Sequence, residues 1–485
     1  MPTPRLVVTI AAPTMAELRR QRDAVADADL VELRLDHVAD VDVAAALAGR
    51  RHPAIVTCRP VWEGGHFEGS EESRRAILES ALNAGAEYVD VEFKAAWARE
   101  LIASTGGKRI VLSTHDFQGV PGDLVERVRA MRAMGAELVK VAVMTRCLAD
   151  NLRLLELERS GQTVLIGMGA SGLATRVLAA HFHSAWSYAG DGHAPGQISA
   201  ARMLNEFRFR SLTERTAVYG VVGFPLSHSI SPSMHNAAFR AAGVDAVYLP
   251  LVAASAEDFT MFATTLGVSG ASITIPYKVD LFKRADDVDE LSARVGAVNT
   301  YRRDHARWQA RNTDVSGFLS PLKEKIDLRA CRAAVVGTGG AARAVVVALA
   351  SMGATVTVYG RSRSKADAVA SIAGGTPAVF PVAPLSWDLL VNTTPVGLYP
   401  NVDDTVFEGP FDGKVVYDLL YNPAETRLLK EAAAAGCSTI GGLEMLVAQA
   451  EDQSEWWLGR RPAAGLMRSA AREALGQMRP PLDKS

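Results

Sequence analysis

The sequence has 485 residues, of which 48% are hydrophobic and 22% are charged, and its formal net charge at pH 7 is −2. This length predicts two to four domains at about 150 residues each, and the near-neutral charge gives no general basic field for nucleic acid. The four cysteines lack the spacing of a zinc site or a disulfide framework, and no apolar run reaches the ~18 residues of a membrane span. We therefore expect no nucleic-acid partner, no metal and no membrane contact. The absence of a targeting segment predicts a cytoplasmic location.

Residues 1 to about 205 contain short apolar, β-branched runs separated by alanine-rich segments with charges at helical spacing. The runs are Val7–Ile10, Leu30–Leu35, Ala54–Arg59, Tyr88–Phe93, Arg109–His115, Leu138–Val143, Thr163–Met168 and Ser184–Ala189. Eight strands that alternate with helices predict a compact (β/α)8 barrel, whose active site lies where the strands end.

One of these runs, Leu138–Val143, carries a lysine, Lys140, in its middle. An unpaired buried ammonium is unfavourable by several kcal/mol, which predicts a lowered pKa and a partly neutral amine. A neutral amine is a nucleophile toward carbonyl groups. The alternative at this point is a structural lysine that reaches a carboxylate.

Further polar residues lie on or at the ends of the predicted strands: Glu32, Arg34, Arg59, Asp90, Glu92 and His115. A Lys, a His and several Arg and Glu residues at one barrel mouth favour imine chemistry on an anionic keto substrate. Lys140 would attack the ketone and His115 would move protons, because an iminium acidifies the neighbouring C–H. Glu92 is expected to fix the orientation of the imidazole.

Over residues 1–205 the sequence resembles type I 3-dehydroquinate dehydratase. The resemblance rests on Glu32-Leu-Arg34-Leu-Asp36, Thr57-Cys-Arg59, Glu63-Gly-Gly65, Asp90-Val-Glu92, Ser113-Thr-His115-Asp-Phe117, Lys140-Val-Ala-Val-Met144, Met168 to Arg176 and Ala194-Pro-Gly-Gln197. It implies that Lys140 forms a Schiff base with 3-dehydroquinate and that His115 is the acid/base of the dehydration. It also implies that Arg176 clamps the substrate carboxylate, while Glu32, Arg34, Arg59 and Gln197 hold the ring hydroxyls and orient the ketone. His193 departs from the serine that the family usually has there.

The second half begins after a charged junction at about 206–217, and its clearest motif is a glycine-rich turn between a strand and a helix. Gly337, Gly339 and Gly340 follow the apolar run 333–336, which suits a pyrophosphate at a helix N-terminus. The next predicted strand, Thr355–Tyr359, is followed by Gly360-Arg361-Ser362-Arg363 instead of an acidic residue. Arginines there accommodate a 2′-phosphate, so we expect NADP rather than NAD; an ordinary tight turn and a solvated basic turn are the alternatives.

Polar clusters surround this nucleotide unit. They comprise Ser229 and Ser231 in a turn, Thr274 and Lys278 past a strand, and Asn299 and Asp314 farther on. Hydroxyls, an amide, a lysine and a carboxylate suit a polyol substrate, although each residue alone is compatible with capping or turn chemistry.

Together these residues resemble shikimate dehydrogenase over roughly 217–480. The resemblance implies that Lys278 and Asp314 are the catalytic pair, and that Ser229 and Ser231 bind the substrate carboxylate. The remaining implied ligands are Thr274, Asn299, Tyr421 and Gln449 around the ring hydroxyls and the nicotinamide, and Gly337, Gly339, Gly340, Ala341, Arg361, Ser362, Arg363, Asn392 and Thr393 for NADP. Three positions depart from the family pattern, namely Ser272, Gly360 and Glu444.

We therefore expect an α/β protein with a (β/α)8 barrel in residues 1–210. A substrate-binding domain follows in 217–318, completed by C-terminal helices at about 441–480, and a Rossmann NADP-binding domain occupies 319–440. The predicted function is dehydration of 3-dehydroquinate followed by NADPH-dependent reduction of 3-dehydroshikimate to shikimate, in a monomer or homodimer. The alternatives are a degradative quinate/shikimate dehydrogenase and a ligand-binding regulator without turnover.

Overall fold

The computed structural model describes residues 3–157, 161–190, 192 and 194–477. The chain divides into two compact units, Met1–Ala217 with Leu249–Gly267, and Val218–Tyr248 with Val268–Ser485. Our domain boundaries at 210, 217, 318 and 440 remain a proposal. No helix in the described part of the chain has the length and apolarity needed to cross a bilayer.

The first unit is built on an eight-stranded parallel sheet in the order β7-β6-β5-β4-β3-β2-β1-β8. A bridge between Thr163 and Ser184 connects the start of β7 to the residues before β8, so the sheet curls into a nearly closed ring. The strands are β1 Arg5–Ala11, β2 Leu30–Arg34, β3 Ala54–Thr57, β4 Tyr88–Glu92, β5 Ile110–Asp116, β6 Leu138–Met144, β7 Thr163–Met168 and β8 Trp186–Ala189. The predicted barrel is confirmed, with strand ends that shift by one or two residues from most of the predicted runs.

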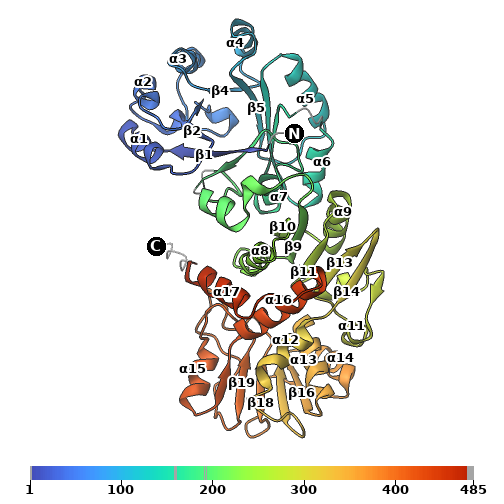
Figure 1. Cartoon of the computed structure of the whole chain (residues 1–485). Coiled ribbons are helices and arrows are strands. Elements are labelled where there is room, and N and C mark those ends of the chain that lie inside the picture. Colours follow the sequence, from blue (N-terminus) through green and yellow to red (C-terminus); the bar gives the residue numbers. More distant parts are fainter. Residues whose placement is uncertain (1–2, 158–160, 191, 193, 478–485) are drawn as a thin grey trace. The chain divides into compact units, whose positions relative to one another are not determined.

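Helices lie around the outside of these strands (Figure 1): α1 Met15–Ala24, α2 Val43–Leu47, α3 Glu71–Asn83, α4 Ala98–Ser104, α5 Leu124–Ala133, α6 Leu152–Leu155 and α7 Leu173–Val177. Two begin at hydroxyl caps, since Thr14 accepts the N–H of Glu17 and Ser70 accepts that of Ser73. Parallel strands covered in this way are mostly buried on both faces, as in β3, where all four residues are buried. The catalytic end of such a barrel is therefore the end where its strands terminate.

The second half starts with a six-stranded mixed sheet in the order β10-β9-β11-β13-β14-β12. Its strands are β9 Ala217–Gly223, β10 Ala246–Val252, β11 Gly270–Ile273, β12 Asp287–Val288, β13 Thr300–Asp304 and β14 Arg307–Arg311. The associated helices are α8 Ser231–Ala241, α10 Lys278–Phe282, α11 Glu290–Val295 and α12 Asp314–Leu319, whereas α9 Ala256–Leu266 belongs to the first compact unit. The C-terminal helices α16 Gly442–Leu458 and α17 Leu466–Gln477 share an apolar cluster with α8.

A parallel six-stranded sheet follows, in the order β17-β16-β15-β18-β19-β20. Its strands are β15 Arg332–Val336, β16 Thr355–Gly360, β17 Thr376–Val379, β18 Leu389–Asn392, β19 Val415–Asp418 and β20 Ser438–Ile440, with helices α13 Gly340–Ser351, α14 Arg363–Ala370 and α15 Arg427–Ala434. Alternate residues of β15 face two separate cores, one shared with α13 and α14 and the other with α15. The strand order reverses between β15 and β18, and nucleotides bind at this switch point in doubly wound sheets.

Candidate functional sites

A cavity of about 100 Å³ lies among the barrel strands and the loops at their C-terminal ends. Predicted site residues from strands and loops far apart in the sequence line it together: Glu32, Arg34, Arg59, His115, Lys140, Arg176 and Gln197. The barrel therefore gathers at one place the residues that the sequence pattern selected.

Lys140 is buried in this cavity and is fully paired with carboxylates. Its Nζ lies 2.9 Å from Oδ2 of Asp90 and 3.5 Å from Oε1 of Glu32. Burial lowers the pKa of Lys140, but the two carboxylates outweigh that effect and raise it above the usual lysine value. Our expectation of a lowered pKa is wrong for this state of the site, because the strand pattern does not reveal the two carboxylates that lie next to Lys140.

His115 is held as a neutral imidazole between Arg59 and Glu63. Burial, with the charges of Arg59 and Lys140, brings its pKa well below the ordinary histidine value. Nη1 of Arg59 lies 3.2 Å from Nδ1 of His115, and the His115 backbone N–H donates to Oε1 of Glu63 at 2.6 Å. The same Glu63 oxygen lies 3.6 Å from Nδ1. Glu63 is thus the carboxylate that positions this histidine.

Glu92, which we expected to orient His115, has other partners. It accepts from Nη1 of Arg59 at 3.0 Å and from Arg74, which is fully buried beneath it. Burial raises the pKa of Glu92 to about 7 against the opposing effect of both arginines. Glu92 therefore acts on His115 through Arg59, and the predicted direct contact is corrected.

Arg176 is the one arginine of the cavity lining whose charge no described carboxylate pairs. Its Nη2 donates to the carbonyl oxygen of Pro195 at 3.2 Å, while its Nε has no partner among the described residues. Burial alone lowers the pKa of Arg176 to about 10. The amide oxygen of Gln197 also lacks a described partner, while its Nε2 donates to Thr9 at 3.1 Å. An unpaired buried guanidinium fits an anionic ligand, because burying a charge without a partner is unfavourable.

Glu32 and Arg34 complete the wall on β2. Glu32 accepts from Thr9 at 3.0 Å and Thr57 at 2.9 Å. Arg34 binds Asp36 through Nε at 2.9 Å and Nη2 at 2.7 Å. Asp36, His37 and His66 form the single group in the described part of the chain that could hold a metal ion, but Arg34 already occupies this carboxylate. We assign no metal there.

The second predicted site centres on an ion pair between Lys278, the first residue of α10, and Asp314, the first residue of α12. Nδ2 of Asn299 donates to the other Asp314 oxygen at 2.8 Å and lies 3.2 Å from Oε1 of Gln449. Four of the predicted residues are therefore connected in one network. A lysine held by a carboxylate is positioned to donate to an oxygen that gains charge.

The other predicted substrate ligands lie on the same half of the chain without direct bonds to that network. Ser231 is the buried first residue of α8, and Ser229 is half-buried two residues before it. Thr274 follows β11, where its backbone N–H donates to Val222 at 2.9 Å. Tyr421 packs against the apolar cluster of α8 and α16, and burial raises its pKa to about 12.

The glycine-rich turn between β15 and α13 has the geometry expected of a nucleotide loop. Gly337 has a φ of +124°, and a Cβ there would lie 2.2 Å from Oγ1 of Thr393, whereas a Cβ on Gly339 would meet nothing within 4 Å. The open side at Gly339 leaves room for a phosphate beside the start of α13, which contains Gly340 and Ala341.

Arg361 and Arg363 follow β16 as exposed side chains without a described carboxylate partner. Ser362 lies between them at the N-cap position of α14, without a capping hydrogen bond from its side chain. Their free charges suit a 2′-phosphate. Asn392 and Thr393 have structural bonds instead: Asn392 donates to Asp418 at 3.0 Å and Thr393 to Val336 at 2.8 Å. They shape the turn that faces the glycines.

Comparison with known proteins agrees with both sites. Residues 6–214 match the model of type I 3-dehydroquinase, 221–301 the shikimate dehydrogenase substrate binding domain, and 442–472 the shikimate 5′-dehydrogenase C-terminal domain. The chain is 32% identical over 495 residues to the chloroplastic bifunctional 3-dehydroquinate dehydratase/shikimate dehydrogenase of Arabidopsis thaliana, covering 93% of this chain and 82% of the relative. The chain belongs to the bifunctional 3-dehydroquinate dehydratase/shikimate dehydrogenase family.

Two further relatives resemble the dehydrogenase half. The NADP(+) shikimate dehydrogenase of Methanothermobacter thermautotrophicus is 36% identical over 285 residues, which are 55% of this chain and 99% of that protein. A crystal structure of a shikimate dehydrogenase in complex with NADP+ is 33% identical with a TM-score of 0.51, covering 54% of this chain and 97% of that one.

The positions that depart from the family pattern have local explanations. Ser272 accepts from the hydroxyl of Tyr248 at 2.6 Å and donates to Gln453 at 2.6 Å, so it links two side chains that the sequence reasoning did not select. Glu444 pairs with Arg468 at 2.5 Å. A Cβ on Gly360 would lie 2.8 Å from Thr338, which explains the glycine. His193 lies outside the described residues.

Proposed function

We propose that Lys140 forms a Schiff base with 3-dehydroquinate and that the dehydrogenase half reduces the resulting 3-dehydroshikimate with NADPH. The first step is supported mainly by the position of Arg176. This buried cation has no described carboxylate partner and lies in the same cavity as Lys140 and His115. A substrate carboxylate would neutralise it with two parallel hydrogen bonds. Such a clamp would fix the ring relative to the lysine.

In the dehydration, the Lys140 ammonium first passes a proton to the neutral His115, and the free Nζ then attacks the ketone. The former ketone oxygen leaves as water with the proton that His115 returns, which gives an iminium. The neutral His115 then removes a proton from the neighbouring carbon, and the electron pair moves into the iminium to form an enamine. The hydroxyl on the next carbon leaves as water with the proton that His115 returns. Hydrolysis of the imine releases 3-dehydroshikimate and restores Lys140. Asp90 and Glu32 hold the lysine in place before the attack.

The test of this step is reduction with borohydride in the presence of 3-dehydroquinate, followed by peptide mass spectrometry. We expect one covalent adduct on Lys140 in the wild type and none in Lys140→Ala. Unmodified wild-type protein under conditions where it turns over substrate would refute the imine.

In the reduction, Lys278 would protonate the substrate oxygen while Asp314 and Asn299 hold the ammonium in position. NADPH supplies the hydride when bound. The residues present fit that cofactor, because the turn is open at Gly339 and the two arginines after β16 lack described carboxylate partners. We assign the adenosine 2′-phosphate to Arg361 and Arg363.

A coupled assay from 3-dehydroquinate and NADPH, with the product identified as shikimate, tests the two steps together. Replacing NADPH by NADH tests the arginines. Comparable kcat/KM values for the two cofactors would contradict the assignment of Arg361. Formation of neither product by folded protein would favour the regulator hypothesis.

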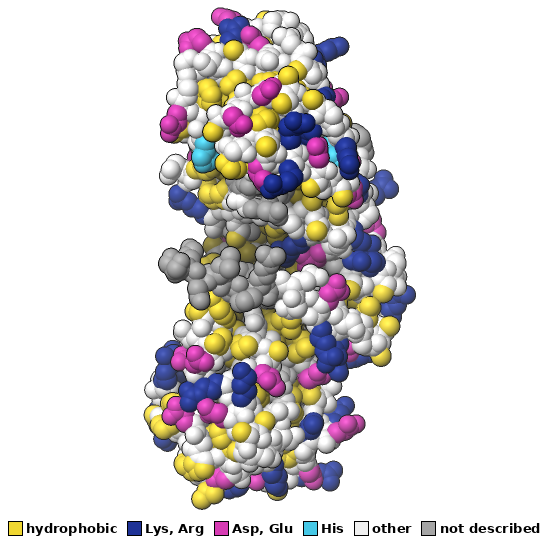
Figure 2. Space-filling view, turned by 90° about the vertical axis from the view of Figure 1, so that its left-hand side faces the viewer, with side chains coloured by type: hydrophobic (Ala, Val, Ile, Leu, Met, Phe, Trp, Pro, Cys, Tyr) yellow, Lys and Arg dark blue, Asp and Glu magenta, His cyan; other side chains and the backbone are white. Residues whose placement is uncertain are grey.

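The remaining parts of the proposal concern partners and location. Lysine and arginine side chains are interspersed with aspartate and glutamate on the face in Figure 2, which supports small-molecule ligands rather than nucleic acid. All four cysteines are free, which supports a reducing compartment such as the cytoplasm. We propose a monomer or homodimer, which sedimentation analysis distinguishes.

A further inference from the structure

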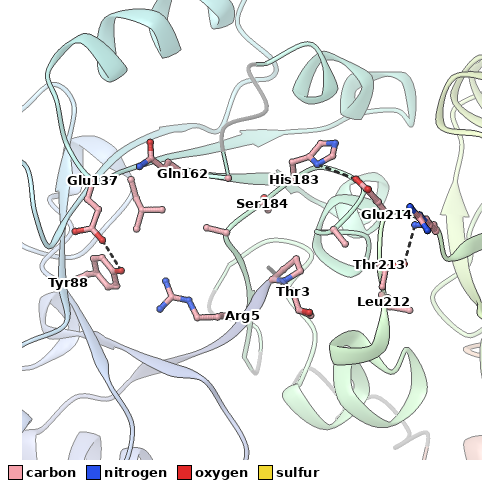
Figure 3. A pocket seen from close by; sticks show the side chains of 16 residues that line it. Thr3, Arg5, Tyr88, Glu137, Gln162, His183, Ser184, Leu212, Thr213 and Glu214 are labelled. Carbon is pink, nitrogen blue, oxygen red and sulfur yellow. Dashed lines mark hydrogen bonds and ion pairs between the residues drawn. The ribbon is translucent and has the colours of Figure 1, made fainter. Parts of the chain in front are cut away.

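A second cavity, of about 600 Å³, lies at the end of the barrel where the strands begin (Figure 3). It is lined by Arg5, Tyr88 and Leu138, the first residues of β1, β4 and β6, and by residues just before β7 and β8. Because the strands are parallel, their starts lie together and away from the ends that form the dehydratase site. None of the proposed dehydratase residues lines this cavity, whose size is within the ~300–1,000 Å³ of ligand pockets.

Arg5 extends into this cavity with an open guanidinium. The guanidinium carbon lies 5.0 Å from the ring centroid of Trp186 and 5.7 Å from that of Tyr88, and Figure 3 shows the side chain in the space beside Tyr88. No described residue forms a hydrogen bond or ion pair with the Arg5 guanidinium. The planar donor fork is therefore available to a ligand.

The carboxylates of the cavity already have partners. Glu137 accepts from the Tyr88 hydroxyl at 3.1 Å and from the Arg109 backbone N–H at 2.7 Å. Glu214 faces the ring of His183 at 3.8 Å. Among the described residues, Arg5 thus has only rings and occupied acidic groups around it, so an incoming anion meets a cation that none of these residues pairs.

The rest of the wall has a polar part and an apolar part. The polar part consists of Thr3, Gln162, Ser184, Thr213 and Arg215, and the apolar part of Pro4, Leu138, Ala180, Ala185 and Leu212. A simple inorganic anion would leave these surfaces uncovered, whereas a flat ring would cover them and stack beside Tyr88 or the guanidinium plane. We propose that this end of the barrel is a second ligand site, which binds a small aromatic carboxylate with Arg5 as the carboxylate ligand.

The experiment follows 4-fluorobenzoate by fluorine NMR during titration with the full-length protein. We expect saturable binding to the wild type and at least a tenfold weaker affinity in Arg5→Gln. The matched control is Arg19→Gln, which removes an exposed arginine of the same barrel and should bind as the wild type does. Saturating 3-dehydroshikimate should leave the bound probe in place, because the catalytic sites are elsewhere.

The melting temperature and the dehydratase kcat/KM of each variant show whether it folds. We expect Arg5→Gln to keep the wild-type values of both. If Arg5→Gln does not fold, Ala180→Phe fills the cavity with Arg5 intact and should also abolish binding. Absence of saturable binding to the wild type, unchanged binding by the folded variant, or displacement by 3-dehydroshikimate would each overturn the proposal.

Discussion

Two buried arginines of the dehydratase cavity differ in their partners, and we therefore expect them to affect stability differently. Arg59 bonds with Asp90, Glu92, Ser113 and His115, whereas Arg176 has no described carboxylate. A buried charge without a partner destabilises the folded state, while removal of one member of a buried pair leaves the other uncompensated. The two substitutions should therefore have opposite effects on folding.

We expect Arg176→Met to raise the free energy of unfolding by about 1 kcal/mol or more while it lowers dehydratase kcat/KM by about 10²–10³-fold, because the clamp is lost. Arg59→Met should instead lower the free energy of unfolding by about 3–5 kcal/mol. Denaturant unfolding of the substrate-free proteins, with dehydratase kinetics, checks both. A lower free energy of unfolding for Arg176→Met would contradict the interpretation of Arg176 as an unpaired buried charge.

The pH dependence of dehydration should follow His115. Its folded pKa lies well below the ordinary value of 6.5, so the neutral base persists as the pH falls through 6.5 and is lost at lower pH. The acid limb of dehydratase kcat/KM is therefore expected below pH 6.5. The pH profile of steady-state kcat/KM measures this directly, because it reports ionisations of the free enzyme. An acid limb above pH 6.5 would show that another group controls the reaction.

The sequence predicted Glu32, Lys140 and His115 because each is a polar residue in an otherwise apolar predicted strand. Arg176 and Gln197 lie outside the strands and were predicted only through the family resemblance. Lys140 and His115 stand at positions where apolar residues would be usual. Glu63 was not selected as a site residue, because it ends a short 3-10 helix, Val61–Glu63, and lies on no predicted strand. The chain turns tightly after it, since a Cβ on Gly65 would lie 2.1 Å from the carbonyl of Arg59. The ionisation of Lys140 was misjudged for a related reason, since a strand pattern does not reveal which carboxylate lies across the barrel.

At the scale of elements, the turn between β15 and α13 separates packing from binding within three residues. Gly337 is required by its positive φ and by its closeness to Thr393, and Gly339 by neither. The pattern of glycines predicted the turn and the nucleotide, but only the arrangement of β18 beside β15 shows which glycine serves which purpose.

We expect Gly337→Ala to lower the free energy of unfolding by about 1–3 kcal/mol, because the strained backbone and the clash with Thr393 both oppose it. Gly339→Ala should keep the wild-type stability and raise the KM for NADPH, because its Cβ points into open space where a phosphate would approach. Thermal unfolding and NADPH kinetics distinguish the two. Equal loss of stability in both variants would contradict this division.

At the scale of the whole molecule, the two lysines that we propose as catalytic, Lys140 and Lys278, lie in separate compact units and share no bonds among the described residues. Lys140→Ala should abolish dehydration and leave NADPH-dependent reduction of added 3-dehydroshikimate within about twofold of the wild type. Lys278→Ala should do the reverse, since additivity holds for residues that share no partners. Separate assays of each step check this, and parallel loss of both activities in either variant would refute two independent sites.

The cavity around Lys140 has a consequence for how fast the dehydratase can meet its substrate. Its volume of about 100 Å³ is below the ~300 Å³ at which ligand pockets usually begin, and Gly64, Phe117 and the Ala194–Gln197 segment lie along its lining. We therefore expect a carboxylated six-membered ring to enter only when these segments move apart. Substrate entry and product release, rather than the chemical steps, would then limit the rate of the dehydration.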